Sequence, residues 1–410
     1  FYLKLKAATV LDTPIGIFDN VLIFDFAALY TTIFITFNIC PSTINLENGV
    51  EIDDIIIWKM KGSEISKEYN LKYKYLQNNI GIYPQLLRGL LEKRNFYKNK
   101  MKEVKKKESE SSINYRVWLY RSDVVKQILN SLFGVGGYSK FNIYNPIVSA
   151  SVTAIGRELI ECIGEYCKSL GLNLCAADTD SLLLQNALNL NEYELEKKLN
   201  DKLKDYIFNK YPTLNKNNYC LFIEFQKKLK KMVFKGVKKK YFGVDENGKI
   251  FVKGFSLVRH DTPKVIKMLL EKIFLMLIEK EDINIIRSEL KNIKLKMKVM
   301  NYKDIGIELK LSKSPSEYIV NQEISRAAIY SNKYLGGNFK AGDVGKLIYI
   351  KKVTKLPITN VILLDENINL DWRFEIDYDK MYKKLILDSI NLLKDIKEFR
   401  IDDLLNENKK

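Results

Sequence analysis

Two short apolar runs separated by an acidic tripeptide constrain the fold of this chain most strongly. Residues 172–177 and 182–184 flank Asp178, Thr179 and Asp180, a pattern typical of a β-hairpin with an acidic tip. Side chains at positions i and i+2 of an extended segment leave the same face, so Asp178 and Asp180 are expected to project together. Taken alone, the same tripeptide also fits a simple polar turn.

A third carboxylate ends another apolar run. Residues 21–24 are apolar with β character, and Asp25 follows them directly. If the acidic hairpin pairs beside this strand, Asp25, Asp178 and Asp180 meet. Packed carboxylates repel one another unless cations neutralise them, so such a cluster favours hard divalent ions with oxygen ligands. Two ions about 4 Å apart would activate a hydroxyl nucleophile and stabilise the leaving oxygen of a phosphoryl transfer.

Two long helices are expected on either side of a short polar turn. Gly81 and Pro84 precede a helical pattern over about 85–107, and the turn 108–112 leads into a second helix over about 114–133. A pair joined in this way forms an antiparallel hairpin. Further helices are expected at about 146–170 and 192–211, and strands at 219–225, 232–237 and 240–244. From 263 onward the pattern is mainly helical and basic, with one strand at 346–351.

The helical hairpin carries cations on defined faces. Arg94 and Lys98 are four residues apart, and Lys126, Asn130 and Phe133 share a face of the second helix. Together these faces offer charge for a polyphosphate and a flat ring for a base. Arg94 and Lys98 alone equally fit a solvated basic face. An ordinary helix with a packed aromatic side chain accounts for the other three residues as well.

Charge and cysteine content narrow the class of protein. Lys and Arg total 67 against 50 Asp and Glu, a net charge of +17. This excess favours a polyanionic partner, with nucleic acid the commonest, although codon bias towards lysine produces the same composition. Five cysteines without a CxxC pair argue against a disulfide framework and a zinc ribbon, and the single histidine, His260, excludes a histidine-rich metal site.

The most apolar stretch does not have the pattern of a membrane span. Residues 21–40 contain Asp25, Asn38 and several threonines, and a buried charge is costly in a bilayer. A buried strand that runs into a packed helix fits these residues better, so no membrane association is expected.

Several segments together resemble the catalytic region of family B DNA polymerases. Residues 25–33, with Asn38 and 41–44, are similar to the first palm motif, 126–134 to the fingers motif and 178–181 to the second palm motif. Residues 238–241 resemble the basic strand that touches the primer terminus. Similarities to the first fingers helix and the thumb occur at 81–101, 254–261, 325–328 and 342–344. The resemblance covers nearly the whole chain, in the order of the family.

The resemblance implies an α+β fold of the right-hand polymerase type. It predicts an antiparallel-sheet palm at 1–80 and 137–262, a two-helix fingers hairpin at 81–136 and a mainly helical thumb at 263–410. The implied activity is that of a DNA-directed DNA polymerase, which adds deoxynucleotides to a primer 3′ end by a two-metal mechanism. Primer-template DNA and deoxynucleoside triphosphates are the implied partners, and the implied location is intracellular.

The resemblance also assigns roles to individual residues. Asp25 and Asp180 would hold two Mg²⁺ ions, for which Mn²⁺ can substitute, and Asp178 would be a near neighbour in the catalytic group. Tyr30 would lie beneath the sugar and exclude a 2′-hydroxyl. The remaining assignments are triphosphate contacts for Arg94, Lys98, Lys126 and Asn130, support of the new base pair for Phe133, and contacts with the primer end for Lys238, Lys239 and Tyr241.

The chain departs from the family pattern at several positions. It has Ala176-Ala177 where the family usually has Tyr-Gly, Thr31 after Tyr30 where a proline is usual, Phe133 for a tyrosine and Ala7-Ala8 for a Gly-Gly pair. No departure removes an implied metal ligand. The changes bear on primer handling and catalytic rate.

Two alternatives to a complete polymerase remain from the sequence. A weakened or inactive relative would act as a DNA-binding accessory subunit, while an RNA-templated polymerase is disfavoured because the paired-Asp turn usual there is replaced by Asp178-Thr179-Asp180.

Only 24 residues precede Asp25, so the exonuclease domain of the family is expected outside this chain. It would be missing, carried by a separate chain, or never present.

Overall fold

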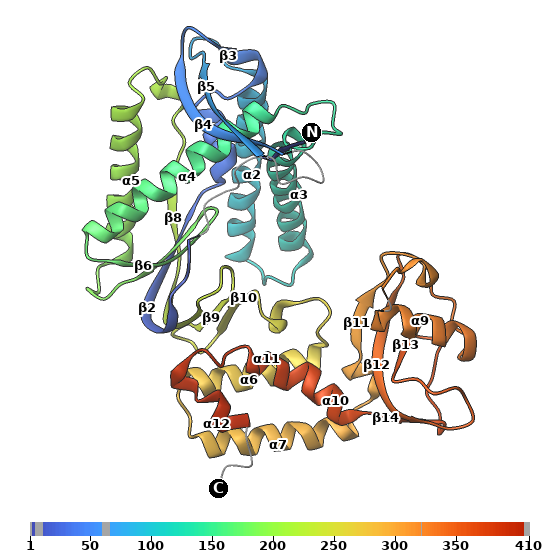
Figure 1. The fold of residues 1–410 in the computed structure, drawn as a ribbon. Coiled ribbons are helices and arrows are strands. Elements are labelled where there is room, and N and C mark those ends of the chain that lie inside the picture. The colour runs from blue at the N-terminus through green and yellow to red at the C-terminus, as the bar shows by residue number, and fades with distance from the viewer. Residues whose placement is uncertain (1, 5–10, 60–65, 321, 406–410) are drawn as a thin grey trace. The chain divides into compact units, whose positions relative to one another are not determined.

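The computed structural model describes residues 2–4, 11–59, 66–320 and 322–405 (Figure 1). Ala7-Ala8 lies outside the described residues. The chain divides into two compact units, one formed by the residues up to 11 with 20–228, and the other by 12–19 with 229–410. Two long strands, β2 (Ile15–Phe26) and β8 (Ile223–Lys235), contain two of the three points where the chain passes from one unit to the other, and the third is at 11–12.

The sheet of the first unit places the acidic hairpin beside the strand that ends near Asp25. Its order is β8, β2, β7, β6, with β6 at Asn173–Asp178 and β7 at Ser181–Gln185. Strand β7 is antiparallel to both β6 and β2, and Asp25 is opposite Ser181. The predicted hairpin is therefore confirmed, and it pairs beside this strand, the condition under which Asp25 was expected near its tip. Residues 21–24 of β2 are all buried, which accounts for their uninterrupted apolar run.

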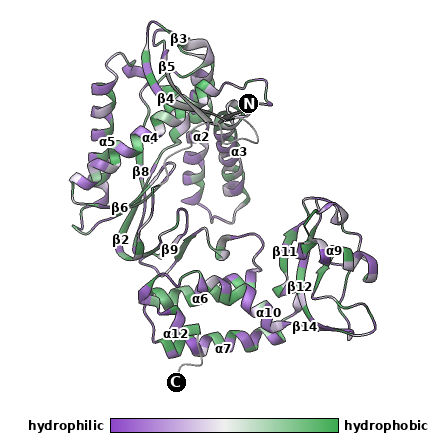
Figure 2. Cartoon of the chain, viewed as in Figure 1, coloured by the Kyte–Doolittle hydropathy of each residue, from purple (hydrophilic) through white to green (hydrophobic). Residues whose placement is uncertain are grey.

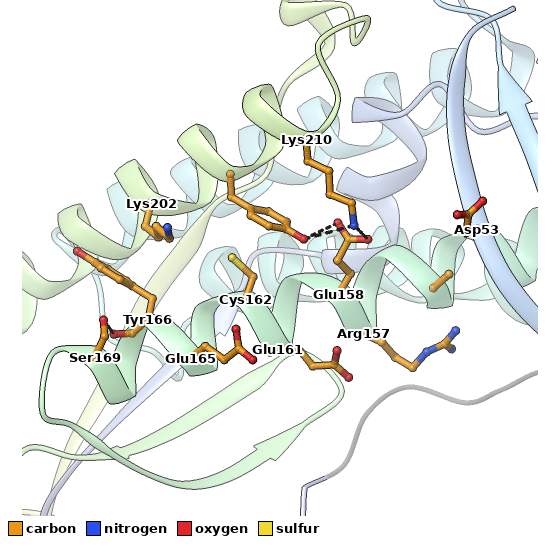
Figure 3. Close-up of a pocket in the computed structure, with 12 residues that line it drawn as sticks. Asp53, Arg157, Glu158, Glu161, Cys162, Glu165, Tyr166, Ser169, Lys202 and Lys210 are labelled. Atoms are coloured by element: carbon orange, nitrogen blue, oxygen red, sulfur yellow. Dashed lines mark hydrogen bonds and ion pairs between the residues drawn. The ribbon is translucent and has the colours of Figure 1, made fainter.

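Three helices build the core of this unit around the sheet. They are α1 (Leu29–Thr36), α4 (Pro146–Ser169) and α5 (Glu192–Lys210). Helix α4 begins where the Asn145 side chain accepts a hydrogen bond from the Val148 amide, followed by a proline in the first turn. Helix α5 is mostly hydrophilic in Figure 2 and buries a single stripe at Leu195, Leu199, Leu203 and Ile207. The four-residue spacing of this stripe explains how a charged sequence packs as a helix.

The predicted helical hairpin is present. It consists of α2 (Ile82–Lys105) and α3 (Ile113–Gly136), which both start slightly earlier than expected. The Ser112 side chain caps α3 by accepting a hydrogen bond from the Tyr115 amide. Trp118 of α3 packs against Tyr97 of α2, with ring centroids 5.8 Å apart. The cap thus stabilises the start of α3, and the aromatic packing holds the two long helices together.

Asn38 fixes the start of α2 to the end of α1. Its backbone has φ 53°, in the left-handed region that asparagine tolerates, and its side chain is fully buried. The side-chain amide donates to the Leu76 carbonyl at 2.6 Å and to the Asn79 carbonyl at 2.7 Å, and its oxygen accepts from the Gly81 amide at 2.8 Å. One buried side chain therefore ties the base of the helical hairpin to the sheet-bearing core.

A second sheet of the first unit has the order β1, β4, β5, β3. Its strands are β1 (Tyr2–Lys4), β3 (Ile44–Asn45), β4 (Val50–Lys59) and β5 (Ser66–Tyr75). Strands β4 and β5 are antiparallel, with Val50 opposite Tyr75. Both of these side chains are buried, so this end of the β4–β5 pair belongs to the core of the unit.

The second unit combines helices with short strands. Next to β8 lie β9 (Tyr241–Val244) and β10 (Ile250–Lys253), in the order β10, β9, β8. Its helices are α6 (Lys264–Ile278), α7 (Ile283–Val299), α8 (Tyr302–Ile305), α9 (Glu323–Tyr334), α10 (Tyr378–Tyr382), α11 (Asp388–Asn391) and α12 (Ile401–Leu405). Helix α6 is mostly hydrophobic in Figure 2 and buries six of its residues, so it forms much of the core.

The C-terminal part of this unit contains more strand than the sequence predicts. A further sheet has the order β11 (Ile307–Lys310), β12 (Val344–Val353), β13 (Val361–Leu364), and β14 (Phe374–Ile376) also pairs with β12. The sequence predicts only the strand that corresponds to β12. The other three have three or four residues each, so each contains little of the two-residue period of a strand.

The described helices include none with the length and apolarity that a crossing of a lipid bilayer requires.

Candidate active site

The tip of the acidic hairpin is a tight turn held against the end of β2. Asp178 is opposite Ser181, so Thr179 and Asp180 alone form the loop. The Asp180 amide donates to the Asp178 carbonyl at 2.7 Å, and the Phe26 amide donates to the Asp180 carbonyl at 2.8 Å. Thr179 has φ 64°, which is unusual for a β-branched residue. Strain of this kind persists where the surroundings hold the backbone, often at functional sites.

A cavity of about 480 Å³ lies beside this turn. Asp25 and Asp180 line it from the sheet, while α2 contributes Arg94 and Lys98. Helix α3 adds Lys126 and Asn130. The structure thus brings two carboxylates, three cations and an amide, all predicted from the sequence, onto one cavity. The other lining residues are Phe26, Ala27, Ala28, Thr32, Leu91, Asn95, Leu129, Cys220, Phe222, Glu224 and Gln226.

A smaller cavity of about 240 Å³ has the predicted aromatic pair on its wall. Tyr30 and Phe133 both line it, with ring centroids 4.5 Å apart and ring planes at 40°. Asn130 and Asp180 line both cavities. The aromatic site and the charged site therefore adjoin each other at the same two polar side chains.

Asp178 is placed differently from the other two carboxylates. Only 4% of its surface is exposed, and it lines neither cavity. The Thr179 hydroxyl donates to its Oδ1 at 3.4 Å. The rule that side chains i and i+2 share a face holds for extended backbone, and Thr179 is not extended. Over the described residues, no group of three or more His, Cys, Asp and Glu side chains is arranged to hold a metal ion.

Arg94 and Lys98, the two α2 cations of the larger cavity, lie in an environment that disfavours their charge. Burial lowers the pKa of Lys98, and the neighbouring Arg94 and Lys126 charges lower it further, while Glu224 opposes the shift. Burial also lowers the pKa of Arg94, against the effects of Asp123 and Glu224. The buried Nε of Arg94 has no hydrogen-bond partner within the described part of the chain. An anionic ligand would reduce the repulsion between these cations and would accept a hydrogen bond from the Arg94 Nε.

Tyr30 is held close to the carboxylate of the hairpin tip. Burial raises the pKa of its hydroxyl, and the negative charge of Asp180 raises it further, against the effect of Arg157. The backbone of Ala28, just before α1, has φ 50° and turns the chain into this helix. The phenol therefore stays neutral at ordinary pH and borders Asp180 without adding charge.

The predicted primer-contacting residues belong to the second unit. Lys238 and Lys239 lie between β8 and β9, and Lys239 has φ 61°. Lys238 is half-exposed and forms an ion pair with Asp12 at 3.4 Å. Tyr241 is buried and its ring stacks on Phe251, with centroids 6.3 Å apart. The two lysines are thus exposed, whereas Tyr241 is buried among the strands.

The sequence analysis missed several residues of the larger cavity. Phe222 directly precedes β8, and Glu224 and Gln226 alternate along the beginning of this strand. All three residues line the cavity. The Ala27 amide donates to the Phe222 carbonyl at 2.8 Å, which joins β8 to the segment after Asp25. Separate strands were expected at 219–225 and 232–237, whereas β8 begins at Ile223 and runs without a break to Lys235. What the sequence did not reveal was that this strand lies next to β2.

Comparisons with known proteins point to one family. A model described as DNA polymerase family B matches residues 3–396. "DNA polymerase 1" of Aeropyrum pernix is 30% identical over 377 residues, covering 88% of this chain and 35% of that protein. "DNA polymerase 1" of Sulfolobus acidocaldarius is 32% identical over 362 residues, covering 85% of this chain and 38% of that protein. The chain thus spans little more than a third of the length of these curated relatives.

The fold has a counterpart among solved structures. The family B DNA polymerase from the hyperthermophilic archaeon Pyrobaculum calidifontis matches 99% of this chain and 48% of its own, with a TM-score of 0.58 and 21% sequence identity. At this identity the likeness concerns the fold alone.

Proposed function

The chain belongs to DNA polymerase family B, and from this membership we propose that it is the core of a DNA-directed DNA polymerase that adds deoxynucleotides to a primer 3′ end. The observation that carries the proposal is the cavity shared by Asp25 and Asp180 with the cations of α2 and α3. The same cavity joins an aromatic pocket through Asn130. Polyphosphate, sugar and base thus each meet suitable side chains.

The proposed division of the chain follows from this role. The hairpin α2–α3 would be the fingers, at 81–136, and the thumb would be 263–410. The palm would comprise 1–80 and 137–262, a range that contributes to both compact units because the contact boundary falls at 228–229, inside β8. We assign primer extension to these residues.

The two carboxylates of the cavity fit divalent cations. Asp25 and Asp180 supply oxygen donors, the ligands that Mg²⁺ prefers, at a place where cations and a polyphosphate would meet. They would hold two Mg²⁺ ions, with Mn²⁺ as a substitute. When bound, such ions lower the pKa of a hydroxyl nucleophile and neutralise charge on the transferred phosphoryl group.

The side chains of this chain would mainly position and stabilise. Arg94, Lys98 and Lys126 would bind the triphosphate, with Asn130 as a neutral donor between the two cavities. The primer 3′-hydroxyl would attack the α-phosphate in line, and pyrophosphate would leave toward the cations. Such catalysis depends on orientation and preorganised charge more than on covalent chemistry.

The aromatic pair and the basic turn would hold the other parts of the substrates. Tyr30 would lie under the sugar and Phe133 against the new base pair. Lys238 and Lys239 would contact primer phosphates, while Tyr241 supports them from within the strands. Binding of the duplex would be insensitive to sequence and would weaken steeply with salt, because phosphate contacts dominate.

Primer extension by the purified protein tests this function directly. With Mg²⁺, a DNA template and deoxynucleotides, we expect a labelled primer to lengthen, and we expect little extension when the template is RNA or the nucleotides are ribonucleotides. Without a divalent ion, extension should stop. Binding of primer-template without extension in either Mg²⁺ or Mn²⁺ would refute the polymerase assignment and support a DNA-binding accessory role.

The affinity for a triphosphate should fall as the pH rises in the alkaline range. Burial and neighbouring cations lower the pKa of Lys98, so its charge is lost at a lower pH than that of an ordinary lysine. A bound polyphosphate favours the charged form, so binding takes up protons where the free protein has partly lost them. Calorimetric titration with a deoxynucleoside triphosphate above about pH 8, where the phosphates are fully ionised, would measure this slope.

The variant Lys98→Arg is the control for the pH effect, because a guanidinium keeps its charge throughout this range. It should bind the triphosphate with nearly constant affinity. An equal slope in the variant and the wild type would show that a group other than Lys98 is responsible.

A further inference from the structure

A third carboxylate lines the proposed nucleotide cavity and has no role so far. Glu224 lies on β8 in the row formed with Phe222 and Gln226, and it is half-buried. The Gln226 side-chain amide donates to Glu224 Oε2 at 3.4 Å. Asp25 and Asp180 border the same cavity. Three negative charges therefore face a space that is proposed to receive a polyphosphate.

Glu224 acts on the charges of the two α2 cations that line the cavity. It opposes the loss of charge of both Arg94 and Lys98, the two α2 cations that line the cavity. Asp123, the other carboxylate that acts on Arg94, does not line the cavity. Glu224 is thus a carboxylate of the cavity wall that favours the charged forms of both α2 cations.

We propose that Glu224 is a positioning residue that takes the place of the polyphosphate charge in the free site and limits the affinity of the site for triphosphate and pyrophosphate. The proposal rests on the proposed polymerase function. A polyphosphate that reaches Arg94 and Lys98 comes close to Glu224, and like charges repel strongly in a partly buried site. The cations would then attract the substrate while Glu224 prevents the product from being held.

A limit on affinity has a kinetic benefit. Release of product limits the turnover of many enzymes, and pyrophosphate carries the charges that bind to the same cations as the triphosphate. A nearby fixed carboxylate weakens both complexes. A role as a metal ligand predicts the reverse, since loss of a ligand would weaken the binding of a metal-polyphosphate complex.

The test compares Glu224→Gln with the wild type in the binding of two inorganic probes, tripolyphosphate and pyrophosphate. Isothermal titration without primer, at one fixed Mg²⁺ concentration, should give dissociation constants about 3- to 10-fold lower for the variant. Glu246→Gln is the matched control, because it removes the same charge at an exposed turn between β9 and β10. Glu224→Asp, which keeps the charge, should bind as the wild type does within about twofold.

Steady-state extension supplies a second readout. In Glu224→Gln, KM for the deoxynucleotide and kcat should both fall, and pyrophosphate should inhibit at a lower concentration. Unchanged or weaker probe binding by Glu224→Gln would overturn the proposal, as would an equal gain in Glu246→Gln. Probe binding does not require polymerisation, so failure of the wild type to extend a primer would refute the polymerase function separately.

Discussion

Primer extension should fall by at least about 10³-fold when Asp180 is replaced by asparagine. The change keeps the size of the side chain and removes one of the two carboxylates proposed to hold divalent ions in the cavity. A loss of about 4 kcal/mol of transition-state stabilisation corresponds to this factor. The turn should survive, because Asp180 is held there by its backbone amide and carbonyl. Single-turnover extension on a primer-template measures the rate.

Asp201→Asn is the matched control for this prediction, because Asp201 is an exposed residue of α5. It should extend the primer at the wild-type rate, and all variants should melt at similar temperatures by circular dichroism. Asp25→Asn should match the loss seen for Asp180→Asn. A variant at position 180 that retains a tenth of the wild-type rate would contradict the assignment.

Asp178→Asn separates the two acidic residues of the turn. Asp178 is buried and lines neither cavity, so its replacement should slow extension less than that of Asp180. The comparison is informative because the spacing of the two residues along an extended segment treats them alike. An equal or larger loss at Asp178 would assign it a direct part in the reaction.

Sequence patterns predicted the long helices of the first unit and missed several short strands of the second. Helices α2, α3, α4 and α5 were expected within a few residues of their observed bounds, since each repeats its apolar positions over several turns. The hairpin β6–β7 was found from its acidic tip. Strands β11, β13 and β14, of three or four residues each, were missed, and each of them pairs with β12. Strand β9 is as short but was expected at 240–244, so length alone does not decide which strands are found.

The site was predictable where local geometry decides it. Helical spacing placed Arg94 with Lys98, and Asn130 with Lys126, on common faces. Helical spacing does not show that these faces meet Asp25 and Asp180 at one cavity, because this depends on the tertiary structure. It was expected only from the family resemblance. The position of Asp178 depends on the left-handed backbone of Thr179, which the propensities of a β-branched residue disfavour. Glu224 was missed because strand alternation does not identify the neighbouring strand.

Tyr30→Ala should raise the incorporation of ribonucleotides relative to deoxynucleotides by about 10²-fold, equivalent to about 3 kcal/mol. Exclusion of a single hydroxyl requires a side chain that cannot move aside. The Tyr30 ring packs against Phe133. On α4, a Cβ built at Gly156 would lie 3.4 Å from Tyr30 Cε1, so the α4 backbone closely approaches the ring. Truncation to alanine removes a ring held in place by two helices and leaves space for the 2′-hydroxyl.

Tyr30→Phe tests whether the ring or its hydroxyl is responsible. The ring and its packing remain in this variant, so discrimination should stay within about threefold of the wild type. Competition between ribo- and deoxynucleoside triphosphates at one template position gives the ratio of kcat/KM values directly. Relaxed discrimination in both variants would assign the exclusion to the hydroxyl beside Asp180, and wild-type discrimination in Tyr30→Ala would place the sugar elsewhere. The expected difference between alanine and phenylalanine follows from steric exclusion, because only alanine opens the space that Gly156 and Phe133 confine.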